Sequence, residues 1–96
     1  MTVKPTVSID AINTLVDVED YIIYKFCEAM GGQDFAMPII RQQFKRADMD
    51  FREPVLPKIK IISNNLVGIV KEFKSPDEAE RLKKEFQRAI LKYEGK

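Results

Sequence analysis

Histidine is absent from this 96-residue sequence, and cysteine occurs once, as Cys27. Without histidine there is no Ser-His or Cys-His dyad, and the commonest general base and zinc ligand are also missing. Cys27 falls among apolar residues in the second half of an expected helix, where the helix dipole disfavours a thiolate, so we expect a small core residue. No catalytic residue is predicted, and we do not expect an enzyme.

Glycine is also scarce, and its four positions fit neither the GxxxxGK nor the GxGxxG spacing of phosphate-binding loops. The acidic residues Asp48, Asp50 and Glu53 lack the central glycine and the final glutamate of a calcium-binding loop. The sequence therefore predicts no cofactor and no metal ion.

No apolar run approaches the ~20 residues that span a bilayer, and residues 1–10 lack the apolar stretch of a signal peptide. Secreted domains of this size normally carry several cysteines that form disulfides, whereas Cys27 stands alone. We therefore expect a cytoplasmic protein with no membrane partner.

The residues that are present are those of one compact domain. Hydrophobic residues make up 45% of the chain and charged residues 32%, with sixteen Lys and Arg against fifteen Asp and Glu. Disordered chains instead combine weak hydrophobicity with charge imbalance. We expect residues 1–7, which carry Pro5 and show no periodicity, to form a flexible arm, and residues 8–96 to form a single helical domain.

Apolar residues that recur every three or four positions predict two helices in the first half of the chain. The first begins between Ser8 and Asp17, where the acidic residues Asp17, Glu19 and Asp20 suit the positive end of a helix dipole. It ends at Gly31-Gly32, because glycine readily takes a positive φ after a last turn. The second runs from about residue 34 to 47 and would hold Pro38 in its first turn, where a missing N–H is tolerated.

A further helix is predicted from Ser75 to about Gly95. Ser75 is followed by a proline at the first helical position and by Glu78 three residues after the cap, which is the capping-box pattern. This is the clearest helix start in the sequence.

Residues 55–73 are open to two interpretations. At 100° per residue their apolar side chains fall on one arc and their polar side chains on the other, which favours a helix. The segment is also rich in Ile and Val and offers residues 63–65 as a turn, which is typical of a β-hairpin over about 58–73. We favour the helix, because periodicity over five turns outweighs propensity. The sequence then predicts an all-α, antiparallel four-helix bundle, whereas the hairpin would give an α+β domain.

Charge is unevenly distributed along the chain. Residues 1–37 hold two basic and six acidic residues, a balance of −4, and residues 38–74 hold eight basic and four acidic, a balance of +4. Cations interleaved with Phe44 and Phe51 in the middle segment predict nucleic-acid binding as an alternative function. The candidate residues are Arg41, Lys45, Arg46, Arg52, Lys58 and Lys60. A total charge of only +1 argues against a dedicated nucleic-acid binder, and the apolar stripe places Phe44 in the core.

Several apolar residues fall off the main helical stripes and have no obvious place in so small a core. They are Tyr21, Met49, Ile61, Val67 and Leu91. Exposed apolar patches usually mark association sites, and two-fold dimers are the commonest result. The primary prediction is therefore a non-catalytic protein-interaction or regulatory module that binds itself, as a homodimer, or another protein.

Overall fold

The computed structural model describes residues 8–51 and 53–95, which form four α-helices and one turn of 3-10 helix. The elements are η1 (Ile9–Ala11), α1 (Leu15–Ala29), α2 (Gln33–Arg46), α3 (Leu56–Phe73) and α4 (Pro76–Glu94). No strand occurs in this part of the chain, so the all-α prediction is confirmed and the hairpin alternative is wrong. The arm predicted for residues 1–7 and the candidate Arg52 lie outside the described residues.

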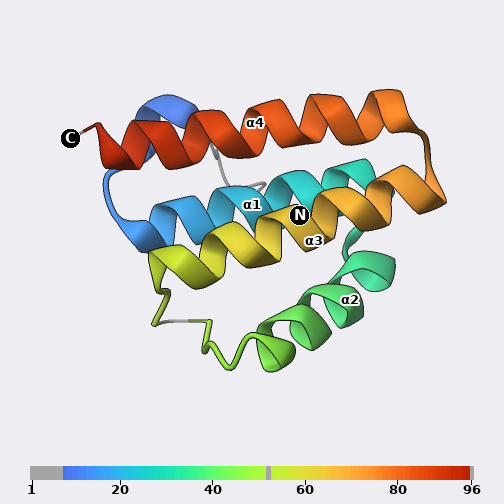
Figure 1. Cartoon of the computed structure of the whole chain (residues 1–96), viewed down its shortest axis with the longest axis horizontal. Helices are drawn as coiled ribbons and strands as arrows, with labels where there is room; N and C mark the ends of the chain where they lie inside the picture. Colours follow the sequence, from blue (N-terminus) through green and yellow to red (C-terminus); the bar gives the residue numbers. More distant parts are fainter. Residues whose placement is uncertain (1–7, 52, 96) are drawn as a thin grey trace, which may run out of the picture.

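Successive helices run in opposite directions, so that the chain folds as an up-down-up-down arrangement (Figure 1). α4 packs along both α1 and α3 and makes its most extensive contacts with α3. α2 contacts α1 and α3 from the opposite side (Figure 1). α1 and α3 therefore form the middle of the molecule, between α4 and α2.

The core lies where the apolar stripes of the four helices meet. α3 shows why the helix wins over the hairpin, because its buried positions recur at helical spacing: Ile59, Ile62, Ser63, Leu66 and Val70. Such a stripe can pack against three other helices at once, and this burial outweighs the strand propensity of Ile and Val. The largest fully buried side chains of the other helices include Phe26, Ile40 and Phe86.

Side chains cap the first turns of α1 and α4. Thr14 is the cap of α1: its hydroxyl accepts a hydrogen bond from the Asp17 N–H at 3.2 Å, and the Asp17 carboxylate accepts from the Thr14 N–H at 2.9 Å. Ser75 Oγ accepts from the Glu78 N–H at 3.1 Å and so caps α4. Gly31 and Gly32 both have positive φ, 92° and 143°, which confirms the predicted end of α1.

The position predicted for Pro38 is wrong. α2 begins at Gln33, one residue earlier than expected, so Pro38 is the sixth residue of the helix and lies in its second turn. It has no N–H to donate to the carbonyl of Asp34, but Asp34 is exposed, and water can take that place. Over the described part of the chain, none of the helices is both long and apolar enough to cross a membrane.

Candidate interaction surface

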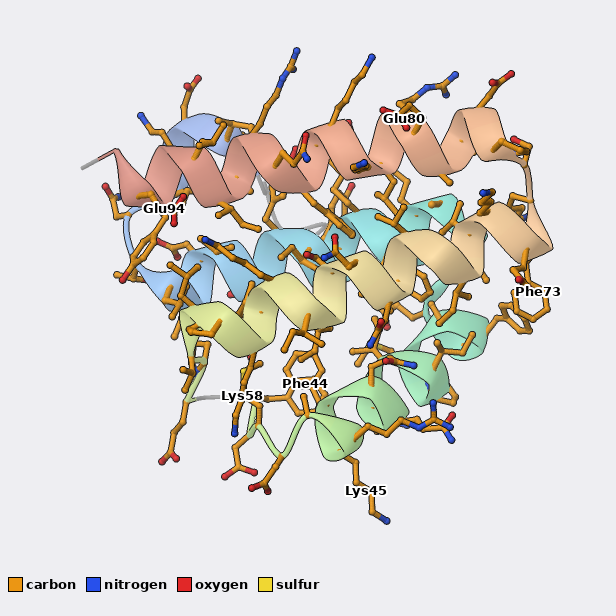
Figure 2. The ribbon with its side chains drawn as sticks, viewed as in Figure 1. Phe44, Lys45, Lys58, Phe73, Glu80 and Glu94 are labelled. Carbon is orange, nitrogen blue, oxygen red and sulfur yellow. The ribbon has the colours of Figure 1, made fainter. Side chains whose placement is uncertain are left out.

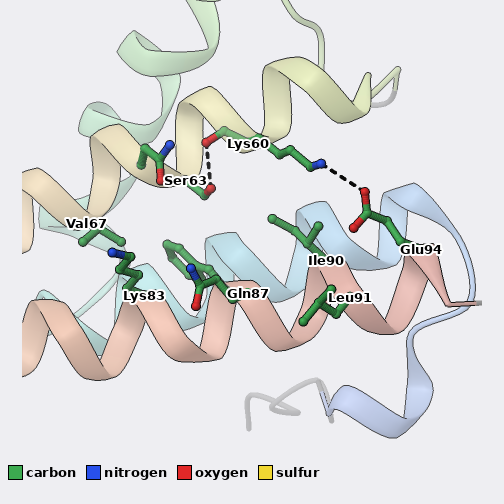
Figure 3. A pocket seen from close by; sticks show the side chains of 10 residues that line it. Lys60, Ser63, Val67, Lys83, Gln87, Ile90, Leu91 and Glu94 are labelled. Carbon is green, nitrogen blue, oxygen red and sulfur yellow. Dashed lines mark hydrogen bonds and ion pairs between the residues drawn. The ribbon is translucent and has the colours of Figure 1, made fainter.

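A groove with a volume of about 470 Å³ runs between α3 and α4 (Figure 3). Its apolar lining consists of Val67 from α3 and of Phe86, Ile90 and Leu91 from α4. Lysine, glutamate and amide side chains of the same two helices form its rim. We refer to this groove and its rim as the α3–α4 face.

A small residue, Ser63, lines the groove where α3 and α4 meet. Ser63 is 5% exposed and faces α4, and its hydroxyl donates a hydrogen bond at 2.9 Å to the carbonyl of Lys60 in its own helix. This bond folds the side chain back onto α3, and the space between the helices stays open (Figure 3). A larger apolar residue at position 63 would occupy part of this space.

Charged residues stand at both ends of the groove. At one end, Lys60 Nζ of α3 lies 3.0 Å from Glu94 Oε2 of α4, and this ion pair joins the two helices (Figure 3). At the other end Lys83 lines the groove and forms no ion pair with any described residue. The α3–α4 face thus carries the ion pair of Lys60 and Glu94 at one end and an unpaired cation at the other.

Three of the five apolar residues predicted to be surplus lie on α3 and α4 at or near this face. Leu91 is 64% exposed and Val67 is half-buried, and both line the groove. Ile61 is 56% exposed on the adjacent side of α3.

The expectation was wrong for Tyr21 and Met49, which are both buried in the core. Tyr21 is covered at the contact of α1 with α4, where Lys25 Nζ lies 5.6 Å from the Tyr21 ring centre and 3.6 Å from Glu85 Oε2. Met49 is turned inward by Asp48, whose φ of 55° reverses the chain after α2. The Met49 N–H then donates to the Phe44 carbonyl at 3.0 Å.

The described cations of the nucleic-acid hypothesis do not form one surface. Arg41 and Lys45 are exposed one turn apart on α2, where Lys45 points away from the bundle (Figure 2), and Arg46 lines a separate cleft between α2 and α3. Lys58 Nζ donates to the carbonyl of Asp48 at 2.7 Å, and Lys60 is paired with Glu94.

The two aromatic residues of the nucleic-acid hypothesis do not support it either. Phe44 is buried, as the apolar stripe predicted, and it stacks on Phe51 with ring centres 4.3 Å apart (Figure 2). One face of the Phe51 ring is therefore already covered by a core residue. Nucleic-acid binding stays a prediction without a continuous basic surface among the residues described.

Cys27 and the acidic connector show no arrangement for chemistry. Cys27 is buried, with Sγ 3.9 Å from Met37 Sδ, and burial raises the pKa of its thiol, which disfavours a reactive thiolate. Over residues 8–51 and 53–95, no three His, Cys, Asp or Glu side chains gather into a metal-binding group.

Sequence reasoning missed Glu19 as a buried residue. Its side chain is 2% exposed, its Oε2 has no hydrogen-bond partner, and burial together with the neighbouring Asp20 raises its pKa to about 7. The signal was available, because Glu19 lies four residues after Leu15 and three before Ile22 on the apolar stripe of α1.

No family model, curated protein or solved structure matches this chain. The α3–α4 face combines an apolar centre with a polar rim, an arrangement that protein interfaces also have.

Proposed function

We propose that this chain is a non-catalytic protein-association module whose α3–α4 face binds its partner, and that it acts as a homodimer. The observation that carries this proposal is Leu91, which is 64% exposed beside an open apolar groove. Burial of a leucine side chain stabilises by roughly 1.5–3 kcal/mol, so a partner that covers Leu91 gains free energy that the monomer leaves unused.

The other exposed apolar side chains make a weaker case for association. Phe35 and Phe73 contact each other edge to face at 6.2 Å, and Phe51 stacks on Phe44. These rings already bury part of their surface within the chain. Single exposed apolar residues such as Val16 and Val55 are common on monomeric proteins. Leu91 differs from them because it borders a hollow that another side chain can enter.

Sedimentation equilibrium over a wide concentration range tests the proposal. We expect the mass of the wild-type chain to rise from monomer to dimer, and Leu91→Glu to stay monomeric because it places a charge at the centre of the contact. Val16→Glu is the matched control, since Val16 is also exposed but lies on α1. Circular dichroism should show the same helix content for all three proteins.

Two results would contradict the proposal. One is a wild-type chain that stays monomeric at every concentration, and the other is a dimer that Leu91→Glu does not weaken. A mobility shift with nucleic acid that grows at low salt would favour the alternative function instead.

A further inference from the structure

We infer that the α3–α4 face is occupied by a second copy in an antiparallel, two-fold arrangement, in which Lys83 of each copy pairs with Glu94 of the other. This inference rests on the proposed function and adds the orientation of the two copies and the residues that set it. The inference depends on the positions of the charged side chains along the groove.

Glu94 and Lys83, at opposite ends of the groove, can each form a further ion pair. The pair with Lys60 engages Oε2 of Glu94 at 3.0 Å and leaves Oε1 open. Lys83 has no ion-pair partner among the described residues. Both side chains line the same groove, eleven positions apart on α4, which corresponds to ~16 Å along the helix axis.

A two-fold axis that crosses the helices at the middle of the groove brings these groups together. It lays α4 antiparallel on α4 of the second copy, so that the Lys83 end of each copy covers the Glu94 end of the other. It also opposes the two helix dipoles, which is favourable. A two-fold axis parallel to the helices would instead bring the two Lys83 ends together, and like charges at an interface are unfavourable.

The same arrangement places apolar side chains at the centre. Leu91 lies ~4 Å along α4 from the midpoint between Lys83 and Glu94, on the Glu94 side, so the Leu91 side chains of the two copies flank the two-fold axis, ~8 Å apart along α4. Each one lies over the apolar lining of the opposite groove, where Val67 is only half-buried. Polar groups then surround an apolar centre, as in known interfaces.

The size of the face predicts a weak dimer. α3 has 18 residues and is therefore ~27 Å long, and two packed helices are roughly 18–20 Å wide. The area covered is roughly 500 Å² per copy, at the low end for specific protein contacts. We expect reversible association that weakens as salt screens the ion pairs.

Charge reversal tests the arrangement on the full chain. We expect Lys83→Glu and Glu94→Lys each to weaken dimerisation at least ~10-fold, because each dimer then holds two like-charge contacts. An equimolar mixture of these two variants should associate within about three-fold of wild type, since the mixed dimer restores both opposite-charge pairs. Lys92→Glu is the matched control, because Lys92 is exposed on α4 outside the groove, and it should not change the affinity.

The outcomes separate this inference from the proposed function. If Leu91→Glu abolishes the dimer while Lys83→Glu and Glu94→Lys leave the affinity unchanged, the face is an interface in another orientation and only the present inference is overturned. Two variants that each weaken the dimer but do not associate when mixed would overturn it as well. A monomeric wild-type chain would overturn both.

Discussion

The interior of the bundle holds a polar group where apolar groups are usual, and the α3–α4 face exposes an apolar group where polar groups are usual. The interior encloses the carboxyl group of Glu19 without a partner for Oε2, whereas the α3–α4 face leaves Leu91 in water. A buried, unpaired carboxylate costs folding free energy, and an exposed leucine forgoes part of the gain from burial. The first departure acts on the stability of the chain, and under the proposed function the second acts on its association. The two properties should therefore respond to different substitutions.

The same truncation at two leucines should give the largest contrast. Leu66 is fully buried on α3, and Leu66→Ala should lower the free energy of unfolding by ~2–5 kcal/mol through lost burial and a cavity. Leu91→Ala should change it by no more than about 0.5 kcal/mol, because Leu91 is exposed in the monomer. Urea unfolding at a concentration below the dimer midpoint measures both values.

Leu66→Ala is a severe change for a domain whose total stability is typically ~5–15 kcal/mol. Ile62→Val is a milder probe of the same helix, with an expected loss of ~0.5–1.5 kcal/mol. Equal losses for Leu66→Ala and Leu91→Ala would show that the interior and the α3–α4 face do not differ in this way.

Glu19 should make stability depend on pH. The unfolded chain releases this proton near its ordinary pKa of about 4.5, while the folded chain holds it up to a pKa of about 7. Between these values the folded state binds more protons, so the free energy of unfolding falls as pH rises, and it levels off above about 7. The total loss is roughly 3 kcal/mol. Glu19→Gln should remove this contribution and be most stabilising, relative to wild type, above neutral pH.

Urea unfolding measured from pH 4 to 8, in steps of about one pH unit, checks this prediction against the pKa values. Glu80→Gln is the control, because Glu80 is exposed on the outer side of α4 (Figure 2) and its replacement should leave the pH profile close to that of wild type. The prediction fails if Glu19→Gln and wild type show parallel profiles over the whole range.

The helix caps allow a finer test of the separation between stability and association. Thr14→Ala removes a side-chain cap from α1, which carries Glu19, and Ser75→Ala removes one from α4, which carries Leu91. Each change should cost about 1 kcal/mol of stability. Neither should change the dissociation constant of the dimer, since neither residue lines the groove. A Ser75→Ala variant that dimerises much more weakly than wild type would show that folding and association are coupled through α4.

The four helices were predictable because each depends on local information. The spacing of apolar residues over 55–73 indicated a helix despite strand-favouring composition, and Ser75 and Gly31-Gly32 marked ends that the structure confirms. Caps and periodicity act within a few residues of chain, so the sequence records them directly.

The direction in which individual side chains point was harder to predict, because it depends on contacts between helices. Tyr21 lies off the main stripe of α1 and is buried only because α4 covers that side. Met49 is buried because Asp48, a residue other than glycine, adopts a positive φ. The described cations of the middle segment diverge because α2 and α3 present them in different directions. The pattern of apolar and polar residues along the sequence carries no information about these contacts between helices.

The ion pair between Lys60 and Glu94 should give the smallest effect on stability. The two side chains are 49% and 37% exposed, and pairs exposed to this degree are worth ~0–1 kcal/mol. Lys60→Gln should therefore lower the free energy of unfolding by no more than about 0.5 kcal/mol, and a double-mutant cycle with Glu94→Gln measures the coupling alone. In the dimer, however, Lys60→Gln leaves Glu94 free to pair with Lys83 of the partner subunit. Dimerisation should accordingly persist in Lys60→Gln and weaken in Glu94→Gln. If both variants weaken the dimer equally, Lys60 contributes to the contact itself and the division of roles between Lys60 and Lys83 is wrong.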